Sequence, residues 1–390
     1  MNYKTNLKRL IIASSLVMMT NMSYAEQFKR FSVSAGWMHV MPQGKANPFN
    51  INTKVNPNQK YAVGEISQDA FINSLSESAL MNDGAGTGGT MPAKDFLEQI
   101  FAADSMGPGG SLASFIGLLT DNNDQTSNVN SNASGRALLS GIDQWKAQGT
   151  GLEAEDVDTL GLTFNYYLND HVSIQLIGGI PPKVDIKGKG EIIANMTGIA
   201  FPDEDNILGV KELFLSTGLD LQQDIPITNL GNKKKASTVR AWTPALEVQY
   251  QFGKTGINKF RPFVGAGIMY AHFNEIELDN SIEADLKAAG HMIQNILDGK
   301  GGAALEGKLS SADPHIRVKT TDAIAPLFTL GATYDLNSEW YGIASVSYAK
   351  LNNRATIDVI NKNDGNKLIH SSTKIDIDPL ITYVGVGYRF

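Results

Sequence analysis

The chain alternates apolar with small or polar residues over several runs of roughly ten residues. In the run 242–252, every second residue from Trp242 is apolar, while the intervening positions include Glu247 and two glutamines. Successive side chains of a β-strand point to opposite faces, so this alternation predicts strands with one apolar and one mixed face. Such strands are typical of outer-membrane β-barrels, in which lipid-facing and lumen-facing residues alternate.

Eight segments of this kind are predicted as strands. Their ranges are 31–41, 157–168, 172–187, 238–252, 260–273, 323–336, 340–351 and 373–390. Short turns follow the second, fourth and sixth strands, whereas long segments follow the odd-numbered ones. Short periplasmic turns and long extracellular loops are the asymmetry expected of bacterial barrels. The pattern therefore predicts an all-β fold, an eight-stranded antiparallel transmembrane β-barrel.

The predicted extracellular loops are unusually long. They cover 42–156, 188–237, 274–322 and 352–372. After Asn280, apolar residues at helical spacing predict a helix near the barrel mouth, with Asn280 or Ser281 as its cap. Short helices are also predicted at 93–101 and 112–119. The first loop contains low-complexity stretches at 82–92 and 106–111, and we expect this loop to be partly disordered.

The first 25 residues have the features of a cleaved export signal. Three positive charges precede an apolar run at 10–19, and Ser23 and Ala25 supply the small residues of a cleavage site. An uncleaved anchor helix is disfavoured, because a helix needs about 20 apolar residues to cross a bilayer. We therefore expect residues 1–25 to be removed and residues 26–390 to form the barrel with its long insertions.

Composition excludes several classes of protein. The absence of cysteine rules out disulfides and thiolate metal sites. The net charge is −7, with 33 basic and 40 acidic residues spread along the chain, whereas nucleic-acid binding needs a clustered basic face. The one basic cluster, Lys233-Lys234-Lys235, is interpreted either as a solvated loop or as a contact for lipopolysaccharide phosphates.

Several segments resemble the OmpW family of eight-stranded outer-membrane proteins. They are Leu160-Gly-Leu-Thr-Phe with the turn Asn169-Asp-His, Ile180-Pro-Pro-Lys-Val-Asp-Ile-Lys-Gly188, Phe260-Arg-Pro-Phe-Val-Gly-Ala-Gly267, Ile377-Asp-Pro and Val384-Gly-Val-Gly-Tyr-Arg-Phe390. The resemblance implies a monomeric barrel in the outer membrane of a Gram-negative bacterium. It also implies a narrow, largely apolar interior that binds or passes small hydrophobic molecules, with sideways release through the wall. The insertions at 42–156 and 274–322 depart from the family in length.

The last strand ends in the pattern Tyr383-x-Gly385-x-x-Tyr388-x-Phe390. This pattern resembles the signal by which the barrel-assembly machinery recognises its clients. Because it fits any outer-membrane barrel, it implies an assembly partner and a location rather than a specific activity.

The inward phase of the predicted strands contains a set of candidate channel-lining residues. They are Met38, Val40, Tyr167, Ile177, Leu327 and Ile343. Polar Gln175, Glu247 and Gln249 share this phase. An eight-stranded barrel leaves room for little more than side chains or one slim ligand. The apolar positions are therefore interpreted as a hydrophobic passage or as simple interior packing.

No motif predicts catalysis, a cofactor or a metal. Residues 84–89 spell G-x-G-x-x-G without the preceding strand that a dinucleotide site needs, so a flexible loop is favoured. The six histidines are scattered, with no pair at metal-ligand spacing. The leading hypothesis is a narrow channel for small apolar solutes, which move by passive diffusion. The alternative hypothesis is a structural barrel whose large loops contact host surfaces, phage or other proteins. A third hypothesis is a barrel-embedded lipid enzyme.

Overall fold

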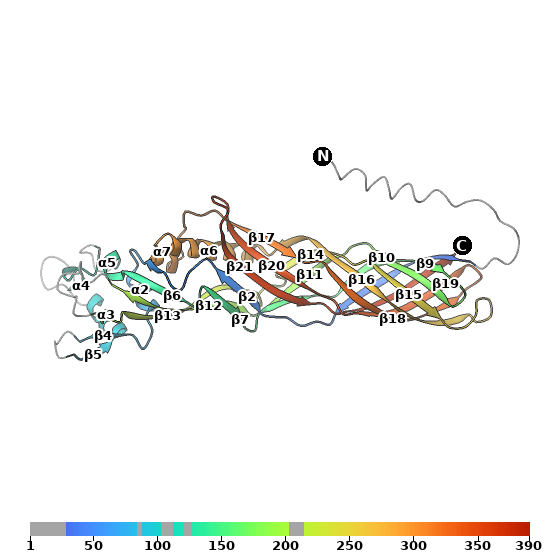
Figure 1. The fold of residues 1–390 in the computed structure, drawn as a ribbon, viewed down its shortest axis with the longest axis horizontal. Coiled ribbons are helices and arrows are strands. Elements are labelled where there is room, and N and C mark those ends of the chain that lie inside the picture. Colours follow the sequence, from blue (N-terminus) through green and yellow to red (C-terminus); the bar gives the residue numbers. More distant parts are fainter. Residues whose placement is uncertain (1–28, 84–87, 103–111, 121–126, 203–213) are drawn as a thin grey trace.

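The structure, a computed structural model, describes residues 29–83, 88–102, 112–120, 127–202 and 214–390. The molecule is elongated, with a barrel at one end and a long protrusion at the other (Figure 1). Within the described ranges, no helix has the length and apolar character needed to span a membrane. The predicted signal segment 1–25 lies outside the described residues.

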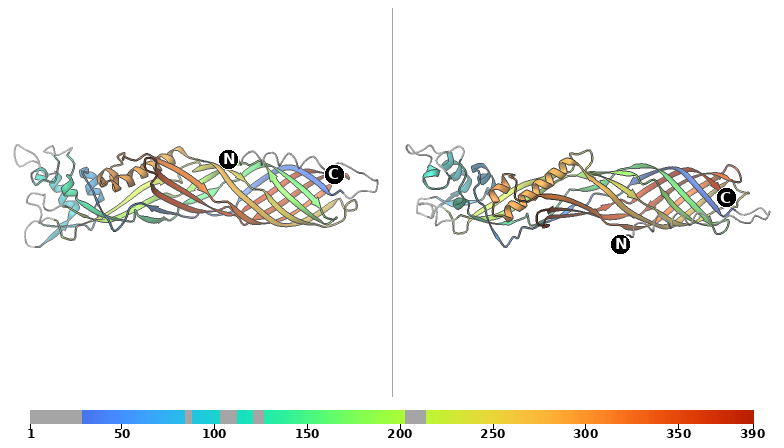
Figure 2. Two further views of the ribbon diagram at one scale, coloured as in Figure 1. Left: turned by 45° about the horizontal axis from the view of Figure 1, so that its top comes forward. Right: turned by 90° about the horizontal axis from the view of Figure 1, so that it is seen from above.

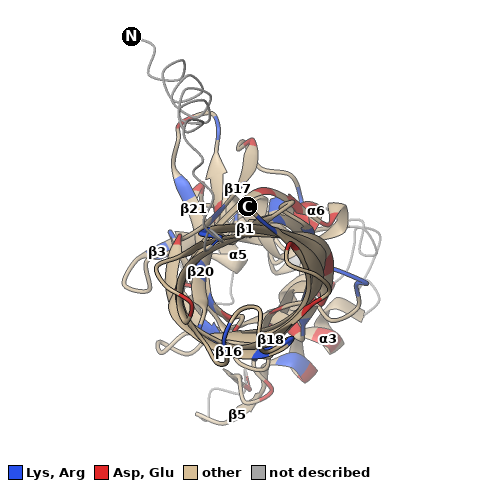
Figure 3. Cartoon of the chain, turned by 90° about the vertical axis from the view of Figure 1, so that its right-hand side faces the viewer, with Lys and Arg blue, Asp and Glu red and all other residues tan. Residues whose placement is uncertain are grey.

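Eight strands close into an antiparallel barrel. In order around the ring they are β15 (Ala245–Gln251), β10 (Val172–Gly179), β9 (Val157–Tyr167), β1 (Phe31–Pro42), β22 (Pro379–Arg389), β19 (Trp340–Ala349), β18 (Ala323–Asp335) and β16 (Phe260–Leu278). Pairing of β16 with β15 completes the ring, which Figure 3 shows end-on. A closed ring leaves no unpaired sheet edge, as a membrane requires. The predicted eight-stranded antiparallel barrel is confirmed.

The outer face of the barrel is apolar, as the alternation predicts. Exposed side chains on this face include those of Leu162, Phe164, Val248, Leu330 and Val384. One end of the barrel contains the three short turns together with the start of β1 and the end of β22, and we call it the turn end. Aromatic rings lie close together at this end. There Phe31 lies 5.1 Å from Tyr166 and Trp340 lies 5.1 Å from Tyr388, between ring centroids. Aromatic girdles of this kind mark the boundary of the hydrocarbon layer.

Three predicted strands are each two strands in the structure. The prediction 172–187 corresponds to β10 and β11 (Lys183–Lys189), 238–252 to β14 (Ser237–Trp242) and β15, and 373–390 to β21 (Lys367–Asp376) and β22. Pro181 and Pro182 interrupt the first and Pro244 the second, because proline has no N–H to donate to the ladder. In the third, Asp378 adopts a left-handed φ of 42° just before Pro379.

The long segments between barrel strands form sheets that prolong the barrel outward, and we call this part the extension. One sheet contains β17 (Pro314–Thr320), β20 (Asn352–Asn361), β21, β2 (Phe49–Thr53) and β7 (Gln144–Ala147). A second contains β13 (Leu219–Asn229), β12 (Glu191–Phe201), β6 (Arg136–Ser140) and β3 (Lys60–Ala62). From β16, the barrel sheet also continues through β14 and β11 to β8 (Gly151–Ala154). These segments are thus largely sheet rather than irregular loop.

Helix α6 (Asn280–Leu297) lies along the outside of the extension (Figure 2). Its apolar face, including Ile282, Leu286 and Ile293, is buried against strands of both extension sheets. The helix was predicted at this place, but its N-cap is Asp279, not Asn280 or Ser281. The Asp279 carboxylate accepts a hydrogen bond from the Ser281 backbone N–H at 2.9 Å.

The remaining helices lie beyond the two extension sheets or beside α6. They are α2 (Gln68–Ser74), α3 (Ala93–Ala102), α4 (Leu112–Phe115), α5 (Ser131–Ser134) and α7 (Gly301–Leu305), with a small hairpin of β4 (Leu80–Asn82) and β5 (Thr90–Pro92). The predicted helix 93–101 is confirmed as α3. The helix predicted over 112–119 is shorter, since a turn at Ile116 and Gly117 ends α4. Of the low-complexity stretches in the first loop, 106–111 and residues 84–87 lie outside the described residues, whereas 88–92 includes β5.

Candidate binding cavity

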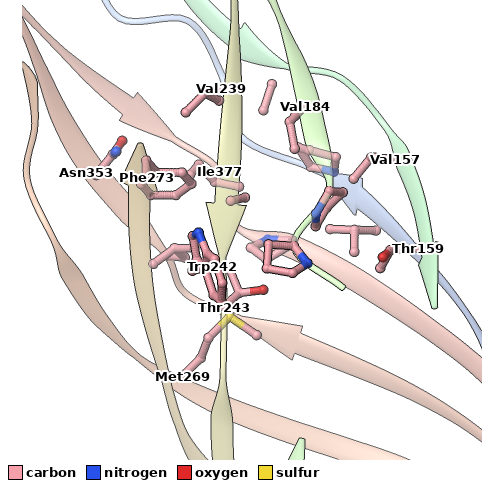
Figure 4. Close-up of a pocket in the computed structure, with 18 of the residues that line it drawn as sticks. Val157, Thr159, Val184, Val239, Trp242, Thr243, Met269, Phe273, Asn353 and Ile377 are labelled. Atoms are coloured by element: carbon pink, nitrogen blue, oxygen red, sulfur yellow. The ribbon is translucent and has the colours of Figure 1, made fainter. Parts of the chain in front are cut away.

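A cavity of about 350 Å³ lies where the outer half of the barrel meets the extension (Figure 4). Inward side chains of the barrel strands form its lower part. Side chains of β8, β11, β14 and β20 form its upper part. The lining is mainly aliphatic, and the volume is near the lower limit of about 300 Å³ for small-molecule pockets. The site is therefore suited to one small, apolar molecule.

Five of the six predicted channel-lining residues line this cavity. They are Met38, Val40, Ile177, Leu327 and Ile343. Tyr167 does not, because it ends β9 at the turn end, where its hydroxyl accepts a hydrogen bond from Ser32 Oγ at 3.4 Å. The strand alternation is enough to place a residue inside the barrel, but not to say at which height.

The upper wall of the cavity was not predicted from the sequence. It includes Val184, Ile186, Val239, Phe273 and Ile357. Alternation does run through Val184 and Ile186, which are both buried on β11. The signal was therefore present, but β8, one of the two strands that pair with β11, comes from the segment 42–156 that was predicted as a loop.

The floor of the cavity is a polar network around Glu247, whose side chain is buried. Gln249 Nε2 donates hydrogen bonds to Gln175 Oε1 at 2.8 Å and to Glu247 Oε1 at 2.6 Å. Thr329 Oγ1 donates to Glu247 Oε2 at 2.7 Å and lies 2.8 Å from Ser347 Oγ. Both carboxylate oxygens of Glu247 are thus bonded, so the network is a fixed part of the interior.

Charged side chains fill the lumen farther toward the turn end. Arg389 Nη2 donates to Asp335 Oδ1 at 2.7 Å, and Arg261 Nη2 lies 3.3 Å from Asp170 Oδ1. Both arginines are almost completely buried. The Arg389 guanidinium also lies 4.4 Å from the centroid of the Tyr341 ring. These contacts plug the barrel below the cavity.

The barrel wall is interrupted beside the cavity. The β10–β15 ladder ends at the pair Ile177–Ala245, and the two segments meet again where the Ala241 N–H donates to the Pro182 carbonyl at 3.0 Å, just before the β11–β14 ladder begins at Lys183–Arg240. Between them, residues 178–182 and 241–245 line the cavity. A Cβ added to Gly178 would meet no atom within 4 Å. The cavity thus reaches the wall at a point where the ladder between β10 and β15 stops.

Two exposed apolar side chains border this interruption. Ile180 is 57% exposed and Trp242 is 45% exposed, and both also line the cavity. Trp242 is labelled in Figure 4, directly before Thr243. We call residues 178–182 and 241–245 the wall break. Its edges are apolar, like the outer face of the barrel around it.

A sequence model of the OmpW family matches residues 124–307 and 306–390, which is more than half of the chain. The chain belongs to the OmpW family. It is accordingly an outer-membrane protein of a Gram-negative bacterium, surrounded by outer-membrane lipids. The match omits β1, which the structure nevertheless places between β9 and β22.

The curated relatives that match this chain are outer membrane proteins W, in agreement with the family assignment. Outer membrane protein W of Escherichia coli K12 is 24% identical over 242 residues, 62% of this chain and 76% of that protein. Outer membrane protein W of Vibrio cholerae is 28% identical over 161 residues, 41% of this chain and 58% of that protein. Among solved structures, the crystal structure of OprG from Pseudomonas aeruginosa aligns with a TM-score of 0.45 and 14% identity, over 93% of this chain and 96% of OprG.

The outer surface of this OmpW-family extension is polar above the apolar band. Lys183 pairs with Glu277 at 3.8 Å and Lys187 with Glu155 at 2.7 Å. In the predicted basic cluster, Lys235 Nζ donates to Asp185 Oδ1 at 3.0 Å. This hydrogen bond lowers the pKa of the Asp185 carboxyl below its usual value. One of the three clustered lysines is therefore already engaged by an acid of the chain.

Three histidines of the OmpW-family chain pair with aspartates rather than with one another. His39 Nδ1 lies 2.8 Å from Asp158, and His272 Nδ1 lies 2.8 Å from Asp322, both at the outer rim of the barrel. His370 pairs with Asp358 in the extension. Among the residues described, no three acidic or histidine side chains gather in a way that suits a metal ion. Residues 84–87 of the G-x-G-x-x-G stretch lie outside the described part.

The four residues of the terminal pattern divide between the two faces of β22. Phe390 is exposed, and its ring lies 5.3 Å from that of Tyr388 on the lipid-facing side. Tyr383 is buried in the lumen, where its hydroxyl lies 2.8 Å from Ser34 Oγ. Gly385 faces the lumen too, and a Cβ there would come within 2.7 Å of the Ala35 carbonyl oxygen of β1.

Proposed function

We propose that this OmpW-family barrel binds small hydrophobic molecules and lets them diffuse passively into the outer membrane. The observation that supports it best is the cavity itself, which is lined mainly by aliphatic side chains and extends to the wall break. Five lining residues were predicted from strand phase alone. No energy source or catalytic group is needed, and we expect no enzyme activity.

Release at the wall break is favoured over release through the turn end. An apolar molecule moving down the axis would have to separate Glu247 from Thr329 and then the buried Arg389–Asp335 pair. Breaking buried polar contacts without replacement is costly, at about 1–3 kcal/mol for each neutral group and more for charges. Sideways movement instead passes from an apolar cavity to lipid of similar polarity.

Blocking the wall break tests this route. In a deletion strain, Gly178→Trp should reduce uptake of a hydrophobic solute toward the level without the protein, because a large side chain would then cover the break. Gly342→Trp is the matched control, since a Cβ at Gly342 also meets nothing within 4 Å but Gly342 does not line the cavity. Equal uptake by both variants and the wild type would rule out sideways release.

The alternative function is binding of another surface or protein by the extension, and the ordered sheets of the extension favour it. The two ends of its outermost part lie together, because the Val63 backbone N–H donates to the Gly135 carbonyl at 2.9 Å. Replacing residues 64–134 by a two-residue turn would retain both barrel and cavity. Lost adhesion with normal uptake would favour the interaction role, whereas altered uptake would favour a channel that includes this part.

The proposal includes export, assembly and partners. Residues 1–25 would be cleaved as a signal, and the barrel would remain monomeric. The barrel-assembly machinery would recognise the terminal pattern that contains Tyr388 and Phe390. Lys233 and Lys234 would contact lipopolysaccharide phosphates. Mass spectrometry of the mature N-terminus tests the cleavage of residues 1–25. Heat-modifiable migration of a Phe390→Ala variant in gels tests whether the assembly machinery needs the terminal pattern.

A further inference from the structure

Asn353 is a buried amide in an otherwise largely apolar part of the cavity wall. Its side chain is 6% exposed, it lines the cavity, and its Oδ1 has no hydrogen-bond partner. It is paired with Ile375 on the adjacent strand β21, and it is one of the lining residues labelled in Figure 4. Most buried amides in folded proteins are hydrogen-bonded, so an unpartnered one in a cavity indicates a missing ligand group or water.

A second amide, that of Gln175 at the floor of the same cavity, has a hydrogen-bond partner for its oxygen but not for its nitrogen. Gln175 Oε1 accepts a hydrogen bond from Gln249, but Gln175 Nε2 has no partner. The neighbouring hydroxyls of Thr163 and Thr329 are already within hydrogen-bond distance of other side chains. The cavity therefore holds two amides with spare hydrogen-bonding capacity, one in the wall and one in the floor.

The cavity offers no positive charge to a ligand. Among the described residues that line it, Glu155 is the one charged side chain, and Lys187 Nζ pairs with it at 2.7 Å. An anionic ligand would be transferred from water into an apolar site without a partner, which is strongly unfavourable. A neutral molecule with a hydroxyl or amide would instead satisfy the amides without bringing in a charge.

We propose that the cavity selects neutral amphiphiles, molecules with an aliphatic part and a hydroxyl or amide head, over plain hydrocarbons and over carboxylates. Asn353 is the residue that determines this preference, with Gln175 as a second contact. The inference rests on the proposed function and names its substrate class. The aliphatic part of the ligand would lie against side chains such as Met269 and Ile377, which line the same cavity.

The test compares three eight-carbon probes, namely octane, 1-octanol and octanoate. Binding to the full mature chain in lipid nanodiscs is measured by saturation-transfer NMR, and partition into empty nanodiscs is subtracted. The wild type should bind 1-octanol more tightly than either other probe. Leucine is nearly equal in size to asparagine. Asn353→Leu should weaken the binding of 1-octanol roughly fivefold to tenfold, which is the ratio that one neutral hydrogen bond contributes, and it should leave the binding of octane unchanged or tighter.

Asn352→Leu is the matched control. Asn352 precedes Asn353 on β20 and is exposed on the opposite face, so this variant should change binding of none of the probes. Asn353→Ser replaces the amide by a hydroxyl, which can still donate and accept a hydrogen bond, and should keep the preference for 1-octanol over octane. Heat-modifiable migration checks that each variant is folded.

The outcomes separate this inference from the proposed function. If Asn353→Leu weakens the binding of octane and of 1-octanol equally, or changes the binding of neither, Asn353 only shapes the wall and the inference is overturned. Wild-type binding of octanoate as tight as that of 1-octanol would overturn it too. If the wild type binds neither octane nor 1-octanol, the proposed function itself fails.

Discussion

The two halves of the barrel interior are built from the same strand alternation but differ in chemistry. Toward the turn end, inward positions carry the buried ion pair of Arg389 with Asp335, and buried Arg261, whose partner Asp170 is partly exposed. Toward the extension, inward positions are mainly aliphatic and leave a cavity. Polar inward residues therefore do not indicate a water-filled pore in this chain. Where they bond to one another they form fixed networks in the interior, and the apolar cavity lies nearer the extension.

The largest effect is expected at the buried ion pair of the turn end. Arg389→Ala should destabilise the barrel by about 3–5 kcal/mol, because the buried Asp335 carboxylate loses its partner. Urea unfolding in lipid vesicles measures the change. Arg240→Ala serves as the control, since Arg240 and Glu275 are an exposed pair, and should cost about 1 kcal/mol or less. Similar costs for both variants would contradict the idea of a tightly built plug.

A slightly smaller effect is expected in the apolar half. Leu351 is 1% exposed and lines the cavity, so Leu351→Ala should cost about 2–5 kcal/mol and enlarge the cavity. Leu309→Ala, at a side chain that is 81% exposed, should change the free energy of unfolding little. The same urea titrations apply, and binding of a longer alcohol by the Leu351 variant would be independent evidence of added space.

The boundary between the two halves should respond to loss of one hydroxyl. Thr329→Val keeps the side-chain shape but leaves Glu247 Oε2 without its donor, at a cost of about 1–3 kcal/mol. Ser345→Ala, in the same lining, should cost less because Ser345 does not bond to Glu247. Uptake of hydrophobic solutes should be unchanged by either variant if molecules leave at the wall break. Faster uptake by Thr329→Val would instead indicate an axial route.

The smallest effect concerns pH and lies in the extension. Burial raises the pKa of the Asp358 carboxyl, but hydrogen bonds from His370 and Lys367 outweigh this and hold the pKa below its usual value. The resulting stability is present above the ordinary carboxyl pKa and is lost as the pH falls toward the folded-state pKa. We expect about 1 kcal/mol or less, because the pair is partly solvated. Asp358→Asn should flatten this part of the stability curve against pH in acid unfolding.

The sequence by itself determined the eight-stranded barrel, the outward faces of its strands and five of the residues that line the cavity. The reason is that the two-residue period of a strand is local, so Met38 and Leu327 can be assigned to the inside without knowing their neighbours. The short turns and the position of α6 were equally local. Each of these predictions needed only the residues of one short segment of the chain.

Only the tertiary structure decided which inward residues meet. Arg389 of β22 meets Asp335 of β18 in the barrel, and Asn50 of β2 pairs with Ser372 of β21 in the extension, because strand pairing joins segments that are far apart along the chain. Strand pairing also set where each side chain lies along the molecule, which separated Tyr167 from the cavity and left Asn353 Oδ1 without a hydrogen-bond partner. Contacts of this kind depend on strand pairing across the whole ring, and no local period encodes them.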